Sequence, residues 1–81
     1  MDPWKLVIAP SAYRHGVTDE DAWHAVAHYL ALYRVNDLMV MVIGPSRTAG
    51  LLEVGIAIWN GDLAAVHAMR ARPVFLRQMG L

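Results

Sequence analysis

The chain has 81 residues, which leaves no room for a second domain, so we expect a single domain over residues 1–81. It has no cysteine, which excludes disulfides and thiolate metal sites, and its formal net charge of zero argues against a strong nucleic-acid binder. Hydrophobic residues make up 57% of the chain, so we expect either one dense core or a core plus an apolar surface that a partner covers.

The first half of the chain predicts a strand followed by a helix. Trp4 to Ala9 alternates with Trp4, Leu6 and Ile8 on one side and stops at a proline, which is typical of a strand. Ser11 to Gly16 is either a short helical turn or a loop. Thr18 is a helix N-cap, with Asp21 three residues on and three acids in the first turn. We expect this helix to run to about Tyr33. Its buried stripe then consists of Ala22, Val26, Tyr29, Leu30 and Tyr33.

The middle of the chain predicts two further strands. Leu38 to Ile43 is continuously apolar, which indicates a central strand buried on both faces, after a turn at Arg34 to Asp37. A seven-residue loop, Gly44 to Gly50, carries Arg47 near its tip. Leu51 to Trp59 then alternates. Its residues expected to face the core are Leu52, Val54, Ile56 and Ile58, whereas Glu53, Gly55 and Ala57 face the other way.

The last third predicts a hairpin and a closing helix. Asn60-Gly61 is a strong signal for a two-residue turn, Leu63 to Met69 is the return strand, and Pro73 opens a helix through Gln78. The element order is therefore β-(turn)-α-β-β-β-α. We expect an α+β fold in which helices pack on one face of a small antiparallel sheet of about four strands.

The register of the hairpin decides where His67 points. With a two-residue turn, Trp59 pairs with Asp62, and an uninterrupted ladder pairs Val54 with His67. Cross-strand partners share a face, so His67 would point toward the helices and Arg70 would share the open face with Glu53. A three-residue loop would instead place His67 on the open face and Arg70 on the face toward the helices.

Two segments resemble a known family. RHGVTDEDAWHA (Arg14 to Ala25) and VHAMRARPVFL (Val66 to Leu76) resemble the motifs of RelE-superfamily toxins of the BrnT type, which are partners in type II bacterial toxin–antitoxin pairs. The resemblance implies a RelE-like fold and a free or ribosome-dependent mRNA endonuclease that a cognate antitoxin neutralises. Two departures, the neutral net charge and Val74 where lysine is usual, would fit a weakened or inactive nuclease.

Histidines and arginines could carry metal-independent RNA cleavage, which needs a base, an acid and cations around the phosphorane. From Arg70 onward the chain has three arginines and no acid. We expect residues 67–72 and 14–15 to converge on one positively charged pocket, with no cofactor. The candidate catalytic residues are His67, Arg70, Arg72 and His15; Arg14, Arg47 and Arg77 are candidates for binding RNA phosphates, and Glu53 for orienting the site.

Each candidate also has a structural interpretation. His67 could be a core histidine bonded to a backbone carbonyl, the arginines could be solvated, and Glu53 could form an ion pair with a neighbouring arginine. His24 and His28, one helical turn apart, could chelate a metal with Asp21 as third ligand. A solvated helix surface is the better interpretation, so we expect no metal.

The expected partners are a cognate antitoxin and RNA or the ribosome, and a second copy of the chain is a further candidate. No signal peptide is visible, and no apolar run approaches the roughly 20 residues of a membrane span, so we expect a cytoplasmic protein without a membrane partner. The rival interpretation is a non-enzymatic module that dimerises or docks a protein. Its motivation is the neutral charge and the high apolar content.

Overall fold

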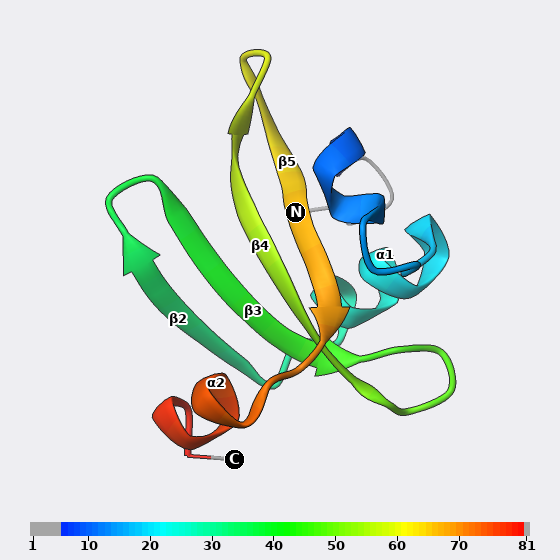
Figure 1. Cartoon of the computed structure of the whole chain (residues 1–81), viewed down its shortest axis with the longest axis vertical. Helices are drawn as coiled ribbons and strands as arrows, with labels where there is room; N and C mark the ends of the chain where they lie inside the picture. Colours follow the sequence, from blue (N-terminus) through cyan, green and yellow to red (C-terminus); the bar gives the residue numbers. More distant parts are fainter. Residues whose placement is uncertain (1–5, 81) are drawn as a thin grey trace.

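The computed structural model describes residues 6–80, which form a five-stranded sheet with helices on both sides (Figure 1). The spatial order is β1-β5-β4-β3-β2; β1 runs parallel to β5, and the other neighbours are antiparallel. The elements are β1 (Val7–Ile8), the short 3-10 helix η2 (Pro10–Tyr13), α1 (Asp19–Ala27), β2 (Ala31–Asn36), β3 (Met39–Pro45), β4 (Leu51–Trp59), β5 (Asp62–Arg70) and α2 (Pro73–Gln78). The α+β class is confirmed, but the sheet is mixed and has one strand more than expected.

The N-terminal strand is shorter than its sequence pattern. Val7–Ile8 forms β1 beside β5, and η2 begins at Pro10, where the proline was expected to end the strand. Trp4 lies outside the described residues. The segment after β1 is thus a helical turn, one of its two expected forms.

Helix α1 begins as predicted and ends six residues early. The hydroxyl of Thr18 accepts a hydrogen bond of 3.2 Å from the backbone N–H of Asp21, which satisfies one of the free N–H groups of the first turn. The last helical residue is Ala27, however, and the expected end at Tyr33 is wrong. Of the expected buried stripe, Ala22 and Val26 are buried, whereas Tyr29 and Leu30 are more than half exposed.

The end of that expected helix and most of the turn expected at Arg34 to Asp37 form β2 instead. Ala31–Asn36 pairs with β3 in antiparallel register, and the backbone N–H of Leu30 already donates to the carbonyl of Ile43. Its residues alternate between half-buried and exposed, the period-2 pattern of a strand. Without β2, the backbone groups along the outer side of β3 would have no ladder partner, so sheet pairing outweighs local helix propensity.

The two strands at the centre of the sheet follow the sequence closely. β4 spans Leu51–Trp59 as predicted, and β3 starts one residue later than expected because Leu38 lies in the β2–β3 turn, where it is 82% exposed. The amide oxygen of Asn36 accepts hydrogen bonds from the backbone N–H groups of Leu38 and Met39 and so shapes this turn.

The hydrophobic core lies between α1, η2 and one face of the sheet, which we call the α1 face; it carries Leu52, Val54 and Ile56. Helix α1 approaches β3 closely at Gly44, where a β-carbon would overlap the backbone carbonyl of Ala25. The buried cluster consists of Leu6, Ala12, Ala25, Val26, Val42, Leu52, Val54, Ile56, Ala65 and Ala68. Ile58, also expected in the core, is 68% exposed because α1 does not extend over this end of β4.

A β-bulge overturns the expected register of β5. The turn at Asn60-Gly61 has two residues, both with positive φ, and Trp59 pairs with Asp62 as predicted. Farther along, Ile56 pairs with Ala65 but Gly55 pairs with His67, so Val66 is an extra residue without a cross-strand partner. Every side chain of β5 after Val66 therefore points to the face opposite the one expected.

The bulge corrects two expectations about the last strand. His67 shares the face of Gly55 and Glu53, not that of Val54, and Arg70 pairs with Leu52 on the α1 face. We call the surface opposite the α1 face the Glu53 face; it also carries Met41 and Ile43.

The two α-helices lie on opposite faces, so the expectation that the helices pack on one face is wrong. The ring of Phe75 in α2 contacts Tyr33 at 6.2 Å between centroids, and Tyr33 pairs with Met41 on the Glu53 face. α2 therefore lies over part of the face that α1 leaves open (Figure 1). Within residues 6–80, no helix is long and apolar enough to cross a membrane.

Candidate functional site

A buried carboxylate lies at the centre of the candidate site. Glu53 has no exposed surface, and both of its oxygens are engaged by residue 72. The backbone N–H of Arg72 donates to Oε1 at 2.8 Å, and the guanidinium donates from Nη2 to Oε2 at 2.8 Å and from Nε to both oxygens at 3.1 and 3.2 Å. The ion pair with a neighbouring arginine, one of the sequence-based interpretations, is present.

The surroundings of Glu53 keep it ionised. Burial on its own raises the pKa of this carboxyl, but the hydrogen bonds from the side chain and backbone of Arg72, and that from His67, outweigh burial and bring the pKa below its ordinary value. The pKa of Arg72 is raised in turn, chiefly by its hydrogen bond to Glu53. At neutral pH the site thus holds a charged but paired carboxylate and guanidinium.

His67 is fixed in one orientation by that carboxylate. Its Nε2 lies 2.9 Å from Oε2 of Glu53, and because an ionised carboxylate only accepts, Nε2 carries the proton. In the neutral form of the His67 ring, Nδ1 is then the nitrogen with a free lone pair. The alternative in which His67 bonds to a backbone carbonyl does not describe this geometry, because its partner is a side-chain carboxylate.

A second histidine stands beside the first. The ring centroids of His15 and His67 are 6.0 Å apart at an interplanar angle of 72°. His15 is exposed and follows η2, which packs on β5. The hydroxyl of Ser11 in η2 donates to the carbonyl of Val66, the bulge residue, at 2.5 Å. The bulge therefore both turns His67 to the Glu53 face and provides the acceptor that holds η2 next to it.

Two positioning residues were missed from the sequence. In the sequence analysis, Ser11 is placed in a segment that is either a helical turn or a loop, and Gly55 at an ordinary strand position. A β-carbon on Gly55 would lie 3.0 Å from Sδ of Met39 and 3.1 Å from Cβ of His67, so glycine makes room for the histidine. The glycine within an otherwise alternating strand was the available signal, since such a residue often marks a bulge or a close approach.

The remaining arginines do not gather at this cluster. Arg70 is exposed on the α1 face, and Arg77 is exposed in the last turn of α2. Arg14 is exposed directly before His15. Of the expected pocket, the structure thus brings together His15, His67, Glu53 and Arg72, with Arg14 beside them in the chain.

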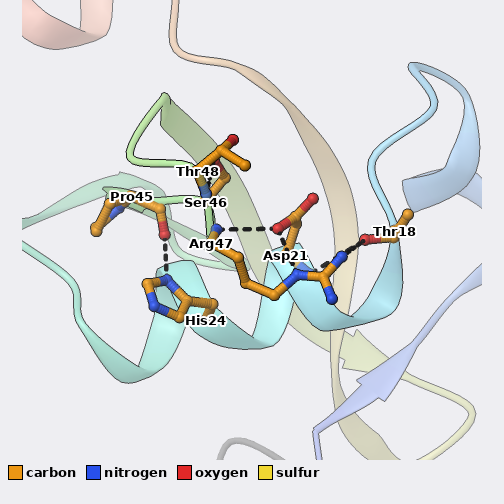
Figure 2. A network of polar contacts seen from close by, with 7 residues as sticks. All are labelled: Thr18, Asp21, His24, Pro45, Ser46, Arg47 and Thr48. Carbon is orange, nitrogen blue, oxygen red and sulfur yellow. Dashed lines mark hydrogen bonds and ion pairs between the residues drawn. The ribbon is translucent and has the colours of Figure 1, made fainter.

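Arg47 belongs to a separate network on α1 (Figure 2). Its backbone N–H and its Nε both donate to Oδ1 of Asp21, at 3.0 and 2.9 Å, and the guanidinium also reaches Thr18. The hydrogen bond from Arg47 is the main cause of the lowered pKa of Asp21. These contacts fasten the β3–β4 loop to the start of α1, which gives Arg47 a structural role.

His24 in α1 and His28, the residue that follows the helix, lie close to each other, with ring centroids 4.4 Å apart. Nδ1 of His24 donates to the carbonyl of Pro45 at 2.7 Å (Figure 2). Asp21, considered as a third metal ligand, is engaged by Arg47 instead. Among residues 6–80, no group of three or more histidine, aspartate or glutamate side chains could hold a metal ion.

Comparisons of the chain with protein-family models, with curated proteins and with solved structures find no match. The resemblance to RelE/BrnT-like toxins therefore rests on the two sequence motifs alone. Chemically, the cluster offers one histidine oriented by a carboxylate, a second histidine beside it, and a guanidinium at its edge. These are the groups that proton transfer at a phosphodiester requires.

Proposed function

We propose that the chain is a metal-independent endoribonuclease that acts as the toxin of a type II toxin–antitoxin pair. The observation that carries the proposal is the pair of imidazoles, His15 and His67, 6.0 Å apart, with His67 oriented by the buried Glu53. Two imidazoles at this spacing can serve the two ends of one phosphodiester, one as base and one as acid.

The proposed reaction is an internal transesterification of RNA. Nδ1 of His67 accepts the proton of the ribose 2′-hydroxyl while the 2′-oxygen forms a bond to phosphorus. The bond from phosphorus to the 5′-oxygen breaks, and protonated His15 donates its proton to that leaving oxygen. The products are a 2′,3′-cyclic phosphate and a 5′-hydroxyl, and the reaction consumes no water or redox partner.

Arg72 supports this chemistry from the edge of the cluster. Glu53 occupies one edge of its guanidinium, yet the Arg72 side chain remains 49% exposed. A phosphorane oxygen can therefore approach its outer edge, and Arg14 next to His15 supplies a second cation. Because Arg72 is already paired, its stabilisation of the phosphorane is weaker than that of a free arginine.

The biological setting follows the resemblance to RelE/BrnT-like toxins. We expect a cytoplasmic protein that meets mRNA free or on the ribosome, and a cognate antitoxin that covers the Glu53 face. Arg77 on α2 and Arg70 on the α1 face would contribute to long-range attraction of RNA and not to the chemical step.

The test is cleavage of a defined RNA by purified protein, with and without translating ribosomes. The wild type should release a 2′,3′-cyclic phosphate end, and His67→Ala and His15→Ala should each lower the rate by about 10²-fold or more. His28→Ala, at an exposed histidine directly after α1, is the matched control and should cleave normally. Absence of cleavage by the wild type under both conditions, or equal cleavage by all variants, would refute the proposal.

A second candidate is a non-enzymatic module that binds another protein. The pairing of Arg72 with Glu53 favours it, because that arginine is then part of the structure before any substrate arrives. In this case the histidine variants would leave cellular growth unaffected, as would induced expression of the wild type.

A further inference from the structure

Two histidines at the end of α1 have no part in the proposed nuclease. His24 lies in α1, and His28 is the C-cap residue directly after the helix, one helical turn farther along the chain. Their ring centroids are 4.4 Å apart at an interplanar angle of 39°. Side chains four residues apart on a helix share one face, and two histidines at this spacing can bind one metal ion together.

The carbonyl of Pro45 fixes how His24 presents its ring. A carbonyl oxygen only accepts hydrogen bonds, so Nδ1 of His24, 2.7 Å away, carries the proton (Figure 2). In the neutral form of the ring, the lone pair is then on Nε2. Histidines that bind a metal usually donate their other ring N–H to a carbonyl or carboxylate in this way. The sequence favoured a solvated helix surface here because it does not reveal this contact.

The distance between the two rings fits a shared ion. An imidazole nitrogen binds Zn²⁺ at about 2.0–2.1 Å, which places the ring centroid roughly 3.2 Å from the ion. With an angle of about 90 to 110° between the two bonds, the centroids lie about 4.5 to 5.2 Å apart. The observed 4.4 Å reaches that range by a small rotation of His28, whose side chain is exposed.

The electrostatic surroundings favour a cation. The carbonyl groups at the end of a helix carry partial negative charge, and His28 lies at that end of α1. The guanidinium of Arg47 is paired with Asp21 and extends toward Thr18, at the opposite end of the helix (Figure 2). Its positive charge is therefore balanced by a carboxylate and directed away from the ring of His24.

We propose that His24 and His28 form a binding site for a divalent transition-metal ion that prefers imidazole, Zn²⁺ or Cu²⁺. The protein ligands are Nε2 of His24 and one ring nitrogen of His28, and water completes the coordination. Mg²⁺ and Ca²⁺ do not suit this site because they prefer oxygen ligands. No group of three histidine, aspartate or glutamate ligands occurs in the described part of the chain, so we expect a modest, micromolar affinity.

The ion acts on α1 and not on the proposed cleavage. α1 packs on β3 and β4, whereas His15 follows η2 and His67 lies in β5. An ion shared by two residues one turn apart holds the last turn of α1 in its helical form. It stabilises the folded protein, because the unfolded chain has no preformed pair of ligands.

Calorimetric titration with zinc chloride and with copper chloride tests the site. The wild type should bind one equivalent of either ion at micromolar concentration, with the copper ion bound more tightly, and should show no binding of magnesium. His28→Gln, which keeps a polar side chain, should weaken the affinity for zinc at least 10-fold. His15→Ala, at an exposed histidine outside the site, is the matched control and should bind zinc like the wild type.

Magnetic resonance locates the ion, because the chain has only four histidines. Substoichiometric Cu²⁺, which is paramagnetic, should broaden the ring protons of His24 and His28 before those of His15 and His67. Broadening that begins at His15 and His67, or equal zinc affinity of the wild type and His28→Gln, would overturn the proposal. Either result would leave the proposed nuclease standing, because its assay contains no added transition metal.

Discussion

The hydroxyl of Ser11 donates a hydrogen bond of 2.5 Å to the carbonyl of Val66, 55 residues farther along the chain. Val66 is the extra residue of the β5 bulge. Bulges leave a residue outside the regular ladder, so this carbonyl is available to a side chain. The contact joins η2, which leads directly to His15, to the strand that carries His67.

Removing this hydroxyl should loosen the pair of histidines without unfolding the protein. We expect Ser11→Ala to lower the free energy of unfolding by about 1 kcal/mol, the usual contribution of one hydrogen bond. Nuclear Overhauser contacts between the rings of His15 and His67 should weaken, because η2 is less firmly held. Thr48→Ala, which removes the 3.1 Å contact between Ser46 and Thr48 in the β3–β4 loop, should leave those ring contacts unchanged. Unchanged ring contacts in Ser11→Ala would contradict this role.

The carboxylate of Glu53 should matter far more to stability than that of Asp21. Glu53→Gln keeps the shape but weakens the bonds to Arg72 and leaves a poorly satisfied buried group, so we expect a loss on the order of 2–3 kcal/mol in urea denaturation. Asp21→Asn, whose partner Arg47 is largely exposed, should lose at most about 1 kcal/mol. Equal losses of unfolding free energy in the two variants would mean that the burial of Glu53 adds nothing to the stability of the fold.

Acid should destabilise the fold partly through this carboxylate. The pKa of Glu53 is lowered in the folded state from its ordinary value of 4.5, so the stabilisation it provides is complete above that value. The stabilisation is lost as the pH falls through the lower, folded-state pKa. Between pH 5 and pH 2 the unfolding free energy of Glu53→Gln should therefore decline less steeply than that of the wild type. Parallel declines of the two proteins would contradict the assignment.

The close approach of α1 to β3 predicts a strong effect at Gly44. A β-carbon there overlaps the carbonyl of Ala25, so Gly44→Ala must push the helix away from the sheet. We expect a loss of about 3 kcal/mol or more, at the upper end for overpacking. Gly50→Ala is the control, since its β-carbon would meet only Oγ of Ser46 at 3.7 Å. Thermal unfolding of the two variants gives the comparison, and a similar midpoint for both would show that α1 adjusts freely.

Sequence patterns predicted the second half of the fold well. The alternation of Leu51 to Trp59, the Asn60-Gly61 turn and the proline that opens α2 are local signals, and each is confirmed. β2 was missed because its residues also fit a continuing helical stripe. The decisive factor, the open edge of β3, is a tertiary contact that no local window contains.

The candidate site could be predicted only in part. His67, His15, Arg72 and Glu53 were all selected by residue type, and the structure places them in one cluster. The faces of His67 and Arg70 were wrong because one inserted residue in β5 inverts the alternation, and a bulge has no reliable sequence signal. Arg47 was selected as a candidate for binding RNA phosphates on charge alone, whereas its partner is Asp21.

One of the bonds to Glu53 comes from the backbone N–H of residue 72, at 2.8 Å. Every amino acid except proline supplies that donor, so the junction between β5 and α2 stays tied to β4 whichever side chain occupies the position. A substitution at residue 72 would therefore keep this backbone bond, although the buried carboxylate of Glu53 would lose the guanidinium that balances its charge.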